Sequence, residues 1–150
     1  MLDTEAPDVD SPRIRQAGKE LLSLALIDAR NHTLRWFAAI ERALAASGLH
    51  VPLLPELNPP LWELGHVGWF QEFWIARNLQ RARGAAVDAD PPRLASIEPH
   101  ADVWWQWTPG MMPAGGEPAL PDFPTTRAWL LETLETTLDL LDKAADSDDA

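Results

Sequence analysis

Residues 58–84 read NPPLWELGHVGWFQEFWIARNLQRARG, and this stretch predicts one helix with a defined start and a defined end. Asn58 is a good N-cap because its side-chain oxygen can accept a bond from a first-turn N–H, and Pro59 suits the first helical position. The arginines of the last turns favour the negative end of the helix dipole. Gly84 can adopt the left-handed conformation that ends many helices.

The helical period places aromatic residues around one histidine on a single face of this predicted helix. His66 lies one turn from both Trp62 and Trp69, so its imidazole is expected among indoles. Two interpretations of His66 are open: a neutral core imidazole bonded to a polar group on another helix, or a metal ligand that projects into a bundle core. The whole stripe consists of Trp62, His66, Trp69, Phe73 and Ala76.

Two glycines and two carboxylates flank this stripe. Gly65 and Gly68 each cost about 1 kcal/mol of helix propensity, so close approach of a neighbouring helix is the expected compensation. Glu63 and Glu72 are the carboxylates nearest to His66 in the sequence. Glu72 lies about 120° around the helix from His66, and we expect both carboxylates to face other elements or solvent.

The composition is that of one acidic domain. At 150 residues the chain can bury a core without cross-links, and the absence of cysteine excludes disulfides and thiolate ligands. A formal charge of −11 disfavours binding to nucleic acid and to anionic lipid. No stretch approaches the roughly 20 apolar residues of a membrane span, and the acidic start does not resemble a signal peptide. We therefore expect a cytoplasmic protein.

Residues 12–47 predict a first helix that ends at Gly48, preceded by a disordered acidic arm at residues 1–11. Asp28, His32 and Arg35 follow one another at helical spacing, which is typical of a solvated ion-pair row. The alternative is that they reach into a polar pocket. The apolar stripe of this helix is expected to consist of Leu22, Leu26, Ala29, Thr33, Phe37, Ile40 and Leu44.

The segments between the predicted helices differ in length. Residues 50–57 form a proline-containing connector of the length that joins antiparallel helices. Residues 85–122 show no sustained period, and we expect their Trp- and Met-rich part, residues 103–122, to pack as a lid. His50 and His100 are expected to be exposed in these connecting segments.

A last helix is predicted over residues 122–145, capped by Asp122 with Pro124 in its first turn. Its apolar face is expected to consist of Leu130, Leu131, Leu134, Leu138 and Leu141. Because no alternating pattern predicts a strand, the fold class is all-α, with a bundle domain at residues 12–145 and an acidic tail at 146–150. Up-down bundles with an internal site usually have four helices, so we expect a fourth from outside this chain.

The segment PPLWELGH, followed by VGWFQEFW, resembles the signature of the DinB-like domain that opens the ergothioneine sulfoxide synthases and the related selenoneine synthases. The upstream DARNHTLRWF, around Arg30 and Thr33, is similar to the first helix of that domain. The resemblance covers residues 12–84, and residues 124–145 match more vaguely. Among the branches, the selenoneine-type sequences are the most similar.

This resemblance implies a DinB-like up-down bundle within a non-heme Fe(II) oxidoreductase. Such enzymes use O₂ to join sulfur or selenium, from a thiol or selenol donor, to an imidazole carbon of trimethylhistidine. The resemblance implies that His66 binds the iron together with two histidines of a fourth helix. That helix and a C-terminal domain are expected outside this chain, which alone would be inactive. Trp62 and Trp69 would then contact the cationic substrate.

Two other functions remain open at this point. A DinB-type metal-dependent thiol transferase would use the same fold with a divalent metal such as Zn(II) or Ni(II). A non-enzymatic helical module would instead associate with a partner through its Trp-rich face. Metal analysis of the full-length protein distinguishes the first from an iron enzyme, and absence of any bound metal favours the second.

Overall fold

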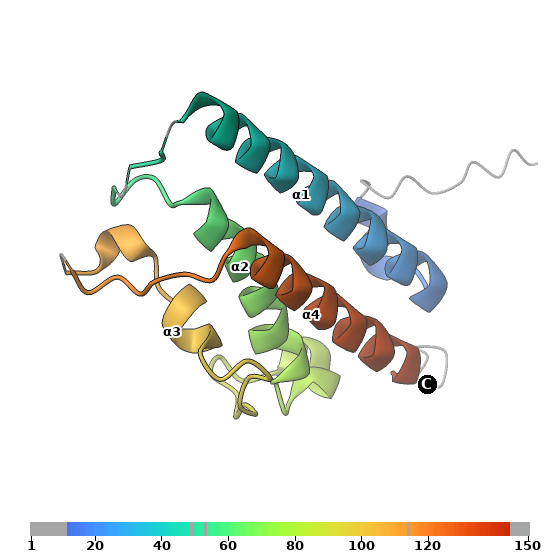
Figure 1. Cartoon of the computed structure of the whole chain (residues 1–150). Coiled ribbons are helices and arrows are strands. Elements are labelled where there is room, and N and C mark those ends of the chain that lie inside the picture. The colour runs from blue at the N-terminus through green and yellow to red at the C-terminus, as the bar shows by residue number, and fades with distance from the viewer. Residues whose placement is uncertain (1–11, 49, 53, 114, 145–150) are drawn as a thin grey trace, which may run out of the picture.

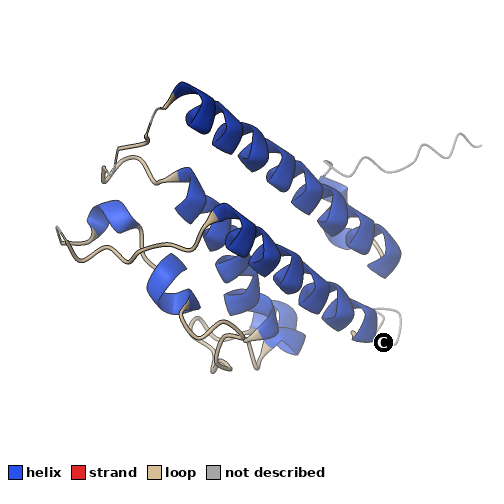
Figure 2. Cartoon of the chain, viewed as in Figure 1, coloured by secondary structure: helices blue, strands red, loops and turns tan. Residues whose placement is uncertain are grey.

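The computed structural model describes residues 12–48, 50–52, 54–113 and 115–144, and these residues are mostly helical. No strand occurs in these ranges, so the all-α prediction is confirmed (Figure 2). No helix among them is long and apolar enough to cross a membrane. The acidic arm predicted at residues 1–11 and the tail predicted at 146–150 lie outside the described residues.

Three main helices pack side by side: α1 (Lys19–Ser47), α2 (Pro60–Gln71) and α4 (Phe123–Lys143). Figure 1 shows α1 running opposite to both α2 and α4. The connector at residues 50–57 thus joins antiparallel neighbours, as predicted. α4 packs against both α1 and α2, and a short helix, α3 (Ala101–Trp105), packs on α2.

The first predicted helix is divided into two segments. A 3₁₀ turn, η1 (Pro12–Gln16), precedes α1, and Gly18 at the N-cap of α1 has extended backbone with φ −70° and ψ 170°. The break falls at the residue with the poorest helix propensity of this region, which explains why one continuous helix from residue 12 was wrong. The predicted end is confirmed, because Gly48 adopts the left-handed conformation with φ 67° and ψ 15°.

The predicted cap of α2 is wrong by one residue. The N-cap is Pro59, with φ −58° and ψ 137°, and Pro60 occupies the first helical position. A proline disfavours helical backbone in the residue before it, so Pro60 keeps Pro59 extended and delays the helix. The Asn58 side chain makes no cap bond and instead donates from Nδ2 to Glu63 Oε1 over 2.7 Å.

The central helix also ends earlier than predicted. It continues from α2 through a π-helical turn, η2 (Glu72–Ala76), and stops at Arg77. There the loop at residues 92–94 takes over the backbone bonds: Leu94 N donates to Arg77 O over 2.8 Å and Leu79 N donates to Pro92 O over 3.0 Å. Gly84 lies in a separate 3₁₀ segment, η3 (Arg81–Ala86), where its φ of 57° and ψ of −124° do not form a helix stop.

α4 begins as predicted, but its buried face differs from the predicted leucine stripe. Asp122 Oδ1 accepts a bond from Thr125 N over 2.9 Å, which confirms the cap. Leu131 is 45% exposed, so its assignment to the apolar face was wrong. Threonines are buried in its place, and their hydroxyls donate to carbonyls of the preceding turn, which satisfies them within the helix. The buried residues of α4 are Thr126, Trp129, Leu130, Thr133, Leu134 and Thr137.

A buried arginine connects the three main helices. Arg30 on α1 is 5% exposed, and its Nη1 donates to Leu130 O over 2.6 Å while its Nη2 donates to Gln71 Oε1. Burial lowers the pKa of Arg30 to about 10. In α1 the buried residues are Arg30 and Leu34, whereas Ala29 of the predicted stripe is exposed. The sequence pattern missed this core position because it counted only apolar residues.

Candidate functional site

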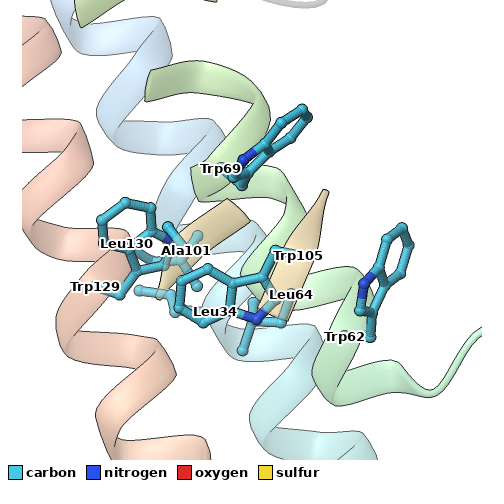
Figure 3. Packing of buried hydrophobic residues seen from close by; sticks show 8 residues of the cluster. All are labelled: Leu34, Trp62, Leu64, Trp69, Ala101, Trp105, Trp129 and Leu130. Atoms are coloured by element: carbon cyan, nitrogen blue, oxygen red, sulfur yellow. The ribbon is translucent and has the colours of Figure 1, made fainter. Parts of the chain in front are cut away.

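His66 lies on α2 between two buried indoles, as the stripe predicted. Its ring stacks on Trp62 with a centroid distance of 4.5 Å and an interplanar angle of 17°, and on Trp69 with 5.4 Å and 19°. Trp62 is 3% exposed and Trp69 is 6% exposed. Figure 3 shows both indoles projecting from α2, with Trp105 between this helix and α4. Two parallel ring contacts leave the imidazole little freedom to turn.

The hydrogen bond of His66 assigns its tautomer. Its Nδ1 lies 2.8 Å from the carbonyl oxygen of Trp105, and because a carbonyl can only accept, Nδ1 carries the proton and donates. In the neutral ring Nε2 then keeps its lone pair. Nε2 has no hydrogen-bond partner among the described residues, and it is not fully enclosed by protein.

The carbonyl that holds His66 belongs to a helix that sequence reasoning missed. α3 has its first and last residues, Ala101 and Trp105, buried in the core. A Cβ on Gly65 would lie 2.0 Å from Trp105 Nε1, so the indole rests directly on the α2 backbone. The prediction of a lid over residues 103–122 was thus wrong for Trp105, which is 1% exposed and part of the core. The spacing of Ala101 and Trp105, one helical turn apart, was the available signal.

Gly68, one turn further along α2, also lets a neighbouring side chain pack directly on the helix backbone. A Cβ there would lie 2.6 Å from Trp129 Nε1 and 3.3 Å from Thr133 Oγ1 of α4. The Trp129 ring stacks on Trp105 with a centroid distance of 5.1 Å. The predicted close approach of neighbours at Gly65 and Gly68 is confirmed, and the neighbours are α3 and α4.

A polar network fixes α3 to α2 on the other side of Trp69. Asp102 Oδ1 accepts from Trp69 Nε1 over 2.7 Å and from Arg77 Nη1 over 2.8 Å, and its Oδ2 accepts from Arg77 Nη2 over 3.1 Å. The Arg77 guanidinium lowers the pKa of Asp102 below its usual range. The two oxygens and the planar guanidinium form a bidentate pair, which sets both distance and orientation.

Glu72 lies buried beside this network and does not face His66, in agreement with the prediction. It is 3% exposed, its Oε2 accepts from Ile97 N over 3.4 Å, and its Oε1 is 3.9 Å from Arg77 Nε without a hydrogen bond. Burial raises the pKa of Glu72 despite the bonds to the 96–97 loop and the nearby Arg77 charge. Glu63, the other carboxylate considered, is held by Asn58.

The remaining histidines do not join His66. His50 and His100 are exposed, as predicted, and His100 bonds to Glu98. His50 lines an apolar hollow of about 560 Å³ between the C-terminal half of α1 and the start of α2, and His66 does not line it. No group of three His, Cys, Asp or Glu that could hold a metal ion occurs in residues 12–144 as far as they are described.

The polar row predicted on α1, which consists of Asp28, His32 and Arg35, is exposed, but its members do not form ion pairs with one another. His32 Nε2 accepts a bond from Trp36 Nε1 over 2.9 Å, and within the described chain no bond joins His32 to Asp28 or Arg35. Asp28 and Arg35 line a half-open hollow of about 490 Å³ against α4, together with Arg127, and His32 does not. The polar-pocket alternative therefore applies to two of the three residues.

No protein family matches the chain, and no curated protein matches it.

Proposed function

We propose that this chain is the N-terminal, DinB-like metal-binding bundle of a non-heme Fe(II) enzyme that uses O₂ to form a C–S or C–Se bond on the imidazole of trimethylhistidine. His66 is one ligand of the iron. The remaining histidine ligands and the C-terminal domain lie outside residues 1–150. The motif around His66 suggested this function, and the ring geometry of His66 supports it.

The observation that carries the proposal is the hydrogen bond from His66 Nδ1 to the Trp105 carbonyl over 2.8 Å. Metal-bound histidines commonly donate their other ring N–H to a carbonyl or carboxylate, which fixes the tautomer and aims the free nitrogen at the metal. His66 has this arrangement, with Nε2 not fully enclosed and without a hydrogen-bond partner among the described residues.

Aromatic rings surround the imidazole of His66. Bound iron would supply open positions at which O₂ and a thiolate or selenolate can meet. Trp62 and Trp69 both stack on the imidazole, and the proposal assigns to these two indoles the contact with the trimethylammonium group of the substrate. Since the described residues provide one histidine at this point, the other donors have to come from further parts of the protein.

The test uses the complete reading frame that contains these 150 residues. Iron per protein and O₂-dependent bond formation are measured for the wild-type protein, for His66→Ala and for His100→Ala, an exposed histidine of α3's N-cap. We expect stoichiometric iron and activity in wild type and in His100→Ala, and loss of both in His66→Ala with unchanged helix content. Full iron in His66→Ala, or tight stoichiometric iron in residues 1–150 alone, would refute the proposal.

The identity of the metal separates this proposal from a DinB-type thiol transferase, which would retain Zn(II) or Ni(II) and need no O₂. A binding module is the other candidate, and exposed aromatic residues beside His66 favour it. Phe70 is 54% exposed and Trp74 is 37% exposed on the same helical segment. A complete protein that forms a complex through this face and retains no metal would support the module.

A further inference from the structure

α3 is too short to hold its own position. A five-residue helix has little stability by itself, so its place on α2 depends on side-chain contacts. One of these is the Trp105 indole over Gly65. The other is the carboxylate of Asp102, which accepts two bonds from Arg77 and one from Trp69. Arg77 is 8% exposed and the Asp102 side chain is 45% exposed, so the pair is closed to solvent on the arginine side and open on the carboxylate side.

Asp102 is connected to two of the three groups that hold the His66 ring. Along α3, Asp102 lies one turn before Trp105, whose carbonyl accepts the bond from His66 Nδ1 over 2.8 Å. Across to α2, Asp102 holds the indole N–H of Trp69 over 2.7 Å, and that indole stacks on His66. One carboxylate therefore fixes the acceptor of the ring and one of its two stacking partners.

We propose that Asp102 is a positioning residue for His66: by holding α3 and the Trp69 indole on α2, it keeps the imidazole in the Nδ1–H tautomer with Nε2 free for a ligand. Without the carbonyl in place, the ring would exchange its proton between the two nitrogens. A hydrogen bond of ordinary net strength shifts that ratio by about tenfold. The use of Nε2 by iron rests on the proposed function, whereas the tautomer of the ring does not.

The test reads the His66 tautomer directly, without a metal. Nitrogen-15 shifts of the ring are measured by NMR near pH 8.5, where an ordinary imidazole is neutral. Asp102→Ala removes all three bonds. Asp102→Asn keeps an acceptor oxygen and removes the charge. The matched control is Asp90→Asn, which removes the charge from an Asp–Arg pair in the loop before α3, where Asp90 Oδ1 accepts from Arg93 Nη1 over 2.7 Å.

We expect the ratio of Nδ1–H to Nε2–H to fall about tenfold in Asp102→Ala, less in Asp102→Asn, and not at all in Asp90→Asn. Circular dichroism checks that helix content is retained. If Asp102→Ala does not fold, the ratio measured in Asp102→Asn tests the inference. An unchanged ratio in the folded Asp102 variant would overturn the inference, and so would an equal fall in Asp90→Asn.

The same variants separate this inference from the proposed function. In the complete protein, Asp102→Ala should weaken iron binding by at most about tenfold, in line with the expected change in the tautomer ratio, and Asp102→Asn by less. A tautomer shift in Asp102→Ala together with full iron in His66→Ala would retain the positioning role and refute the metal site. An unchanged tautomer in Asp102→Ala together with iron loss in His66→Ala would retain the metal site and refute the positioning role.

Discussion

Gly65→Ala adds one methyl group at the point where α3 meets α2. The new Cβ would lie 2.0 Å from Nε1 of Trp105, 2.4 Å from its Cε2 and 2.5 Å from its Cδ1. The indole cannot swing aside, because it is 1% exposed and stacks on Trp129 at 5.1 Å. Either α3 moves away from α2 or the indole leaves the core.

Two opposing terms set the size of the effect. Alanine improves helix propensity at residue 65 by about 1 kcal/mol. Overpacking a close-packed core costs about 1–3 kcal/mol, and loss of a buried indole costs about 3–5 kcal/mol. We expect a net loss of about 2 kcal/mol in the free energy of unfolding, which lowers the melting temperature of a domain of this size by about 4–8 °C.

Urea unfolding followed by far-UV circular dichroism measures this change. The control is Gly18→Ala, where nothing lies within 4 Å of the added Cβ and φ is −70°, so the loss should stay below about 1 kcal/mol. A Gly65→Ala protein that is more stable than wild type would show propensity acting without a clash. The packing of Trp105 on Gly65 would then be refuted.

Two further predictions concern single side chains. Trp69→Ala should lower stability by about 3–5 kcal/mol or unfold the domain because the indole is 6% exposed, whereas Trp107→Ala, at a site 64% exposed, should change it by less than about 0.5 kcal/mol. Comparable melting temperatures of the two variants would contradict the assigned face of α2. For Glu72, burial raises the folded pKa above the ordinary value of 4.5, so its contribution to stability is present below pH 4.5 and is lost as pH rises through the folded pKa. The stability of Glu72→Gln relative to wild type should therefore increase as the pH rises from 4 to 7, as measured by urea unfolding at each pH. A decrease over that interval would mean that folding lowers the pKa of Glu72.

The sequence correctly predicted those features of the fold that depend on residues close to one another in the chain. The aromatic stripe of α2, the left-handed Gly48 and the Asp122 cap each depend on residues within one or two turns of one another, and each is confirmed. The start of α2 also follows a local rule, the restriction that Pro60 places on Pro59. That rule can be read from the sequence, and at this position it outweighs the capping preference of Asn58.

Contacts between distant residues decided the rest. The glycines at 65 and 68 predicted a close neighbour, but nothing in the sequence identified it as Trp105 for one and Trp129 for the other. Arg30 was absent from the predicted core because its burial depends on a carbonyl of α4 and an amide of α2. The hydrogen-bond acceptor of His66 was also missed, because it is the backbone carbonyl of Trp105 and every residue type has such a carbonyl.

The packing of α3 and the orientation of His66 are one arrangement. Trp105 uses its side chain to fill the space that Gly65 leaves on α2, and its carbonyl to accept the proton of His66 Nδ1. A substitution that moves the indole therefore also moves the acceptor, so loss of the proposed iron in such a variant would not by itself separate a packing defect from a ligand defect. Asp102 offers the separation because its carboxylate contacts Trp69 and Arg77 and does not touch the ring. A tautomer that follows the Asp102 carboxylate while helix content stays constant would tie the orientation of His66 to this polar network, beyond the general compactness of the core.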